Sequence, residues 1–89
     1  AIGSDGYMTI GEYSIQPKAN LKGADLSGCN LKGAELEEAD LSGANLTGTQ
    51  LQGANLEGAR LSGANLEKAN LAGANLTDAW LDNANLKKS

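Results

Sequence analysis

The side chains in this sequence that could do chemistry are mostly carboxylates. Eleven acidic residues stand against seven basic ones, histidine is absent and Cys29 is the single thiol. Hydrolases and transferases need a nucleophile, a base or a metal in a concave site, and no Gly-rich loop joins a strand to a helix here. Carboxylates can chelate a hard cation, but no loop is present to wrap one. We therefore predict no enzyme activity, no cofactor and no metal.

The structure that must position these side chains has a five-residue period. From Ala19 to Lys88 leucine recurs at every fifth residue, fourteen times, and alanine stands two residues before it except at Cys29 and Thr49. A step of five residues advances about 140° around an α-helix and changes face along a strand. Neither element would gather the leucines on one side. The period instead predicts a solenoid whose units each turn by a fixed angle and point Leu and Ala at a common axis.

Periodicity leaves the number of units per coil open, and here the motif itself is informative. Units such as Ala24-Asp25-Leu26-Ser27-Gly28 resemble the A-(D/N)-L-x-x signature of the pentapeptide-repeat family over residues 19–88. The resemblance implies an all-β fold, a right-handed quadrilateral parallel β-helix (solenoid) with four units per coil, hence about 3.5 coils of 20 residues. It also implies a cyanobacterial type of protein, located in the cytoplasm or the thylakoid lumen.

Two positions of the unit predict local backbone structure. The residue before leucine is Asn or Asp in ten of fourteen units, and such short side chains can bond the backbone of their own turn or form ladders between coils. The last position is glycine nine times, which predicts a corner with unusual dihedral angles. Cys29 and Thr49 share one inward column, where we expect small buried residues in place of alanine.

If residues twenty apart stack, the acidic charge gathers on one side. The face made from 34–38, 54–58 and 74–78 carries acids and no base, while the other faces are neutral or slightly positive. This uneven charge is either a chance feature of a solvated surface or a docking face for a basic partner. We call this set the acidic face; it consists of Glu35, Glu37, Glu38, Glu57 and Asp78.

A second candidate is the column Asn20, Asp40, Arg60 and Trp80, which departs most from the consensus. Stacking would place Arg60 between a carboxylate and an indole, so that an ion pair and a cation–π contact could form. This column is either a local surface contact or a protein-interaction site centred on Arg60 and Trp80.

The two ends lie outside the regular pattern. Residues 1–18 lack the repeat and form either a tail or a cap on the first coil; of these, 1–7 are an expression remnant before Met8 or the start of a processed product. Residues 19–88 form the β-helix domain. The last coil exposes apolar side chains, so the natural chain continues, two molecules form an end-to-end homodimer through the C-terminal coil, or the end frays.

These observations favour a non-catalytic structural or protein-interaction module that presents flat rigid faces to an unknown protein partner. The net charge of −4 argues against direct nucleic-acid binding, and no apolar run is long enough to span a membrane. The resemblance offers an alternative, a DNA mimic that binds a type II topoisomerase, although this chain is short and has few acids for that role. A structural fragment without a partner is a third hypothesis.

Overall fold

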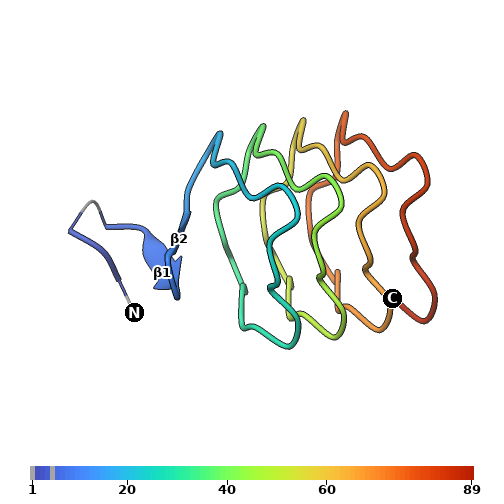
Figure 1. The fold of residues 1–89 in the computed structure, drawn as a ribbon, viewed down its shortest axis with the longest axis horizontal. Coiled ribbons are helices and arrows are strands. Elements are labelled where there is room, and N and C mark those ends of the chain that lie inside the picture. The colour runs from blue at the N-terminus through green and yellow to red at the C-terminus, as the bar shows by residue number, and fades with distance from the viewer. Residues whose placement is uncertain (1, 5) are drawn as a thin grey trace.

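The computed structural model describes residues 2–4 and 6–89, which form a short hairpin followed by a stack of coils (Figure 1). Strand β1 (Met8–Ile10) pairs antiparallel with β2 (Tyr13–Ile15), and Thr9 lies opposite Ser14. β-Branched and aromatic side chains favour this extended conformation. Gly11, with a φ of 58°, allows the tight reversal between the strands.

From residue 19 onward the backbone forms coils of twenty residues, and each coil stacks on the one before it. Parallel bridges join residues twenty apart, from Asn20 with Asp40 to Asn65 with Asn85. The bridged residue is always the one that precedes leucine. The coils therefore lie side by side as the sequence predicts, and the hairpin stands at one end of the stack (Figure 1).

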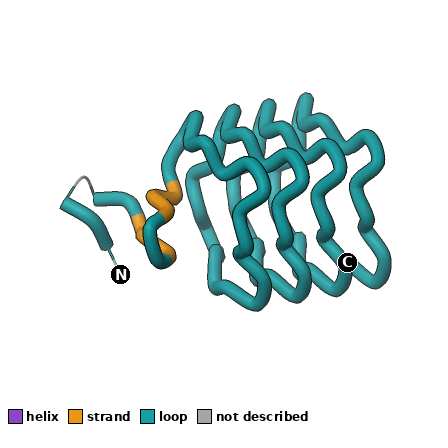
Figure 2. The backbone as a smooth tube through the Cα atoms, in the orientation of Figure 1, coloured by secondary structure: helices purple, strands orange, loops and turns teal. Residues whose placement is uncertain are grey.

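The coils of the predicted β-helix are joined by isolated bridges rather than by strands. The two strands of the described residues are β1 and β2, and the rest of the chain follows a loop-like path (Figure 2). Each five-residue unit contains a two-residue turn. Because the turn redirects the chain at once, each unit contributes a single bridged residue rather than a strand.

Hydrogen bonds nevertheless occupy nearly every amide of the unit. In the unit that begins at Ala44, the Ala44 N–H donates to the Leu41 carbonyl at 3.0 Å, which closes the preceding turn. The Asn45 N–H donates to the previous coil, and the N–H groups of Leu46 and Gly48 donate to the next one. The fifth amide, that of Thr47, bonds a side chain. A repeat without long strands thus still provides hydrogen-bond partners for its backbone N–H groups.

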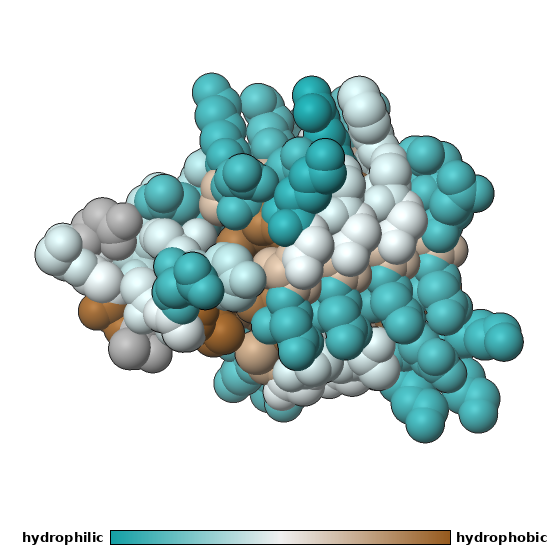
Figure 3. Space-filling view, viewed as in Figure 1, coloured by the Kyte–Doolittle hydropathy of each residue, from teal (hydrophilic) through white to brown (hydrophobic). Residues whose placement is uncertain are grey.

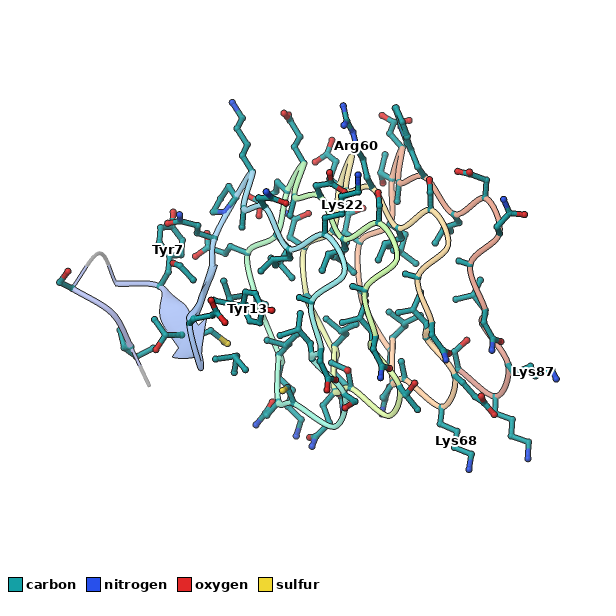
Figure 4. The ribbon with its side chains drawn as sticks, viewed as in Figure 1. Tyr7, Tyr13, Lys22, Arg60, Lys68 and Lys87 are labelled. Atoms are coloured by element: carbon teal, nitrogen blue, oxygen red, sulfur yellow. The ribbon has the colours of Figure 1, made fainter. Side chains whose placement is uncertain are left out.

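The core is a column of leucine and alanine inside the coils. Leucines from Leu21 to Leu66 are at most 2% exposed. At the first coil Met8, Ile10 and Tyr13 pack against this core, and Tyr13 lies between the hairpin and the coils (Figure 4). Figure 3 shows apolar surface in the same region.

The C-terminal coil is covered less completely than the others. Its leucines Leu71, Leu76 and Leu81 are only half-buried, and Leu86 is 40% exposed. Within residues 2–4 and 6–89, the N–H groups of Leu71 and Leu76 find no acceptor, whereas those of earlier leucines bond the next coil. This coil therefore presents both apolar side chains and unpaired donors.

Candidate interaction surfaces

The residue before leucine serves the backbone of its own unit. In all ten units with Asn or Asp at this position, the side-chain Oδ1 accepts a hydrogen bond from the N–H two residues later, at 3.0 to 3.3 Å. This Asx turn confirms the predicted local bond. Side-chain bonds between coils are fewer: among the described residues Asn75 Nδ2 donates to Asn55 Oδ1 at 3.4 Å, and Ser62 Oγ donates to Asp82 Oδ1 at 2.7 Å.

Four units carry another residue at this position: Glu35, Gln50, Arg60 and Trp80. Within the described part of the chain, the amide two residues after each of them has no hydrogen-bond acceptor. Longer or acceptor-free side chains cannot reproduce the Asx geometry. These four positions therefore lack a bond that the other ten units make. Two of the four, Arg60 and Trp80, are bridged to each other.

The last position of each unit adopts a left-handed backbone, as the glycines predict. All nine repeat glycines there have φ between 65° and 70°. The same conformation is adopted without glycine at five corners, with φ between 56° and 62°: Glu38, Lys68, Asp78, Asn83 and Lys88. Left-handed backbone is unfavourable for residues with a Cβ, so these five corners are strained relative to glycine.

The acidic face is assembled as the sequence predicts. Bridges from Glu35 to Asn55 and from Asn55 to Asn75 stack the three units that carry the five acids. Glu35, Glu38, Glu57 and Asp78 are exposed. Glu37 is half-buried, and its Oε1 is buried without a hydrogen-bond partner. A rigid backbone thus displays four exposed carboxylates on one side, which gives that side a negative potential.

The column through Arg60 contains one of the two contacts that the sequence suggested. The guanidinium carbon of Arg60 lies 4.9 Å from the centroid of the Trp80 ring, which is a cation–π contact. Asp40 and Arg60 are bridged through their backbones, but no ion pair joins them among the described residues. The reason is local, since Oδ1 of Asp40 accepts the Ser42 N–H at 3.0 Å.

Hydrogen bonds from Ser42 to Asp40 also hold the pKa of this carboxyl below its ordinary value. Burial of Asp40 opposes this effect, and the charges of Arg60 and Lys22 add to it weakly. Asp40 consequently stays ionised at neutral pH. The hydrogen bond from Ser42 holds the negative charge of Asp40 in place near Arg60.

Beside this column the surface is hollowed. A hollow of about 630 Å³ runs over all four coils; we call it the corner hollow, and it is lined by Lys18, Asn20, Lys22, Glu38, Asp40, Gly58, Arg60 and Trp80. Lys22 and Arg60 extend from the same side of the stack (Figure 4). Glycine at position 58 leaves a gap in the corner column, and a Cβ there would lie 3.3 Å from Cγ of Glu38.

Sequence reasoning did not assign Lys18, Lys22 or Gly58 to a site. The signal was nonetheless present, because the twenty-residue spacing places Lys18, Glu38 and Gly58 in one corner column. Lys18 also adopts the left-handed backbone of a repeat corner, with a φ of 63°. The first repeat corner therefore lies inside the segment that the sequence assigned to the tail.

The inward column of small residues differs partly from expectation. Thr49 is fully buried, and its Oγ1 donates to the Leu26 carbonyl at 2.8 Å. Cys29 is only half-buried and has a free thiol, so the prediction of a buried cysteine was wrong. Cys29 packs against the core from the first coil, although its neighbours Leu26 and Leu31 in that coil are fully buried.

Among residues 2–4 and 6–89 no group of three or more Cys, Asp or Glu side chains is arranged to hold a metal ion. No helix in the same residues is long and apolar enough to cross a membrane.

Comparison with known proteins identifies the repeat. The family model for pentapeptide repeats matches eight copies over residues 19–58 and 49–87. The chain belongs to the pentapeptide-repeat family. No curated protein matches the chain.

Two solved structures are similar over much of the chain. A pentapeptide repeat protein from the Arabidopsis thaliana thylakoid lumen is 32% identical, with a TM-score of 0.78 over 96% of this chain and 58% of its own. A pentapeptide repeat protein (Rfr23) from the cyanobacterium Cyanothece is 42% identical, with a TM-score of 0.62 over 78% of this chain and 54% of its own. The chain thus spans little more than half the length of either protein.

Proposed function

We propose that this chain is a non-catalytic module that binds another protein through its rigid outer faces. The observation that supports this proposal best is the acidic face, on which Glu35, Glu38, Glu57 and Asp78 are exposed from a backbone with nearly all amides bonded. Rigid presentation lowers the entropy lost on binding, and a cluster of like charge speeds encounter with a partner of opposite charge. The partner expected at this face is a basic protein surface.

A specific architecture is part of this proposal. We infer a right-handed quadrilateral β-helix of about 3.5 coils, supported by the four ladders of bridges per twenty residues. We also infer that residues 8–18 cap the first coil, supported by the packing of Met8, Ile10 and Tyr13 against the core. Location in the cytoplasm or the thylakoid lumen is likewise a proposal, supported by the source of one relative.

A charge-swap pair of variants tests the acidic face. Glu35→Lys with Glu57→Lys reverses two exposed carboxylates of the face, and Glu12→Lys with Glu67→Lys changes the net charge equally elsewhere. In affinity capture from the native source, the proposal predicts that a protein retained by the unmodified chain is lost with the first variant and kept with the second. Equal capture by both variants would contradict the proposal.

The last coil suggests self-association as a second property. We infer an end-to-end homodimer through this coil, because Leu86 is 40% exposed and Leu71 and Leu76 leave their N–H groups unpaired within the described residues. Such an end invites pairing with a further backbone edge. Analytical ultracentrifugation should show a concentration-dependent dimer, and a strict monomer at high concentration would count against it.

The alternative, a DNA mimic that binds a type II topoisomerase, stays a prediction from resemblance, because no feature of the described residues favours it over general protein binding. A DNA supercoiling assay with gyrase separates the two hypotheses. The interaction proposal predicts no inhibition at micromolar protein.

A further inference from the structure

The corner hollow combines features that a purely structural surface has no reason to combine. Arg60 and Trp80 occupy positions at which ten other units carry an Asx turn, and each gives up that bond. Departures from a local sequence preference, such as Asn or Asp before leucine, are most common at functional sites, where binding of a ligand or partner offsets the lost stability. Both residues are exposed, Trp80 by 53%. Their contact therefore contributes little to the core.

The lining of the corner hollow has more basic than acidic side chains, whereas the chain as a whole has more acidic ones. Lys18, Lys22 and Arg60 line it together with the acids Glu38 and Asp40, although the chain carries a net charge of −4. None of the three cations forms an ion pair within the described residues. Asp40 bonds Ser42 instead. The hollow thus presents three unpaired cations to solvent.

Arg60 is also held in an orientation suited to a carboxylate. The guanidinium carbon of Arg60 lies over the Trp80 ring, 4.9 Å from its centroid, and a contact with the ring face leaves the guanidinium N–H groups free. No acceptor for them is found in residues 2–4 and 6–89. A planar fork held by an aromatic ring can bind a carboxylate through two parallel hydrogen bonds. Tryptophan and arginine are also the residues most enriched at the energetic centres of protein interfaces.

The length of the hollow defines the shape of its ligand. It extends from Lys18 and Lys22 in the first coil to Trp80 in the fourth. Three coil spacings of about 4.8 Å make about 14 Å, which an extended peptide covers with about four residues. An open groove of this length fits a chain segment better than a compact small molecule, which prefers an enclosed pocket.

We propose that the corner hollow binds an extended acidic segment of a partner protein, with a carboxylate on Arg60 and Lys22 and an apolar side chain against the exposed part of Trp80. This inference rests on the proposed interaction function and adds a second surface to it. The two surfaces share Glu38 but have opposite charge preferences, so variants that leave Glu38 unchanged test them independently.

Trp80 is the only tryptophan of the chain, so its fluorescence reports binding directly. The probe is a blocked five-residue peptide alternating glutamate and leucine, and its control has glutamine in place of glutamate. We expect a saturable fluorescence change with the glutamate peptide and at least a tenfold weaker response to the control. Equal affinity for the two peptides, no response at millimolar peptide, or equally effective competition by inorganic phosphate would overturn the proposal.

Two substitutions separate binding from folding. Arg60→Asn restores an Asx acceptor, so the thermal midpoint should not fall while the glutamate peptide loses at least tenfold in affinity. Arg60→Lys keeps the charge but not the planar fork, and should lose severalfold. Unchanged affinity in Arg60→Asn would overturn the assignment of the carboxylate to Arg60.

The acidic-face variant, Glu35→Lys with Glu57→Lys, provides the control for the other surface. It should bind the glutamate peptide as the unmodified chain does. If this variant loses its native partner but keeps the peptide, both proposals stand. If the peptide binds but both charge-swap variants capture the native partner equally, the proposed function of the acidic face is wrong and the inference about the corner hollow stands. If capture depends on the acidic face and no peptide binds, the inference about the hollow alone is wrong.

Discussion

The left-handed corners allow a clean test of backbone strain, because glycine and non-glycine residues occupy equivalent positions. Gly63 has a φ of 69°, and a Cβ added there meets nothing within 4 Å. Lys68, at the next corner, has a φ of 62°. Gly63→Ala introduces a Cβ at such a corner, and Lys68→Gly removes one. The two substitutions therefore change the conformational preference of the backbone in opposite directions without changing core packing. Gly58 is unsuitable for this purpose because its Cβ would press on Glu38.

The expected magnitude follows from two opposing effects. A left-handed conformation costs a residue with a Cβ about 1–2 kcal/mol, while alanine restricts the unfolded chain and recovers about 0.4–1 kcal/mol. Gly63→Ala should therefore lower the free energy of unfolding by about 1 kcal/mol. Lys68→Gly should raise it by a similar amount. For a domain of this size, a change of about 1 kcal/mol moves the thermal midpoint by about 4–8 °C.

Urea unfolding followed by far-ultraviolet circular dichroism measures these changes. The two variants should shift the midpoint in opposite directions with an unchanged slope against denaturant. The control is Gly58→Ala, which should be at least as destabilising as Gly63→Ala because steric contact adds to strain. Shifts in the same direction, or no loss in Gly63→Ala, would refute the strained-corner interpretation.

Three further predictions concern the turns, the core and pH. Gln50→Asn should create an eleventh Asx turn and raise the free energy of unfolding by about 1 kcal/mol, measured by urea unfolding; destabilisation would contradict the role given to this position. Leu46→Ala, at a site 1% exposed, should cost about 3 kcal/mol, whereas Leu86→Ala should cost about 1 kcal/mol or less, because Leu86 is 40% exposed; equal costs in thermal unfolding would contradict the observed burial. Hydrogen bonds from Ser27 lower the pKa of Asp25, so its contribution to stability is present above the unfolded pKa of about 3.9 and is lost as pH falls through the lower folded pKa. Asp25→Asn should keep the turn and reduce the slope of stability against pH in that acidic range, and an unchanged slope would argue against this linkage.

Most of the backbone was predictable because the repeat encodes it five residues at a time. The leucine period identifies the inward side chains, the glycines identify the corners and the Asn/Asp position identifies the turns. Each inference uses a local rule that recurs in most units. The acidic face follows from the same rules once the coil length is known, since Glu35, Asn55 and Asn75 then stack.

The features that escaped prediction depend on competition between neighbouring groups. An ion pair between Asp40 and Arg60 looked favourable from their stacking, but the nearer Ser42 amide takes the carboxylate oxygen. Cys29 is half-buried although Leu26 and Leu31 of the same coil are fully buried, a difference that a rule applied alike to every unit does not capture. The corner hollow required the side-chain conformations around Gly58 and the extension of the corner column to Lys18.

The stacking of residues twenty apart underlies every surface described above, and NMR can observe it bond by bond. Scalar couplings across hydrogen bonds should connect the amide nitrogen of Leu46 with the carbonyl carbon of Asn65, and that of Asn65 with the carbonyl carbon of Ala44. The same pattern should recur in each ladder. Couplings between coils at separations other than 19 and 21 residues would show that the columns, the acidic face and the corner hollow are wrongly assembled.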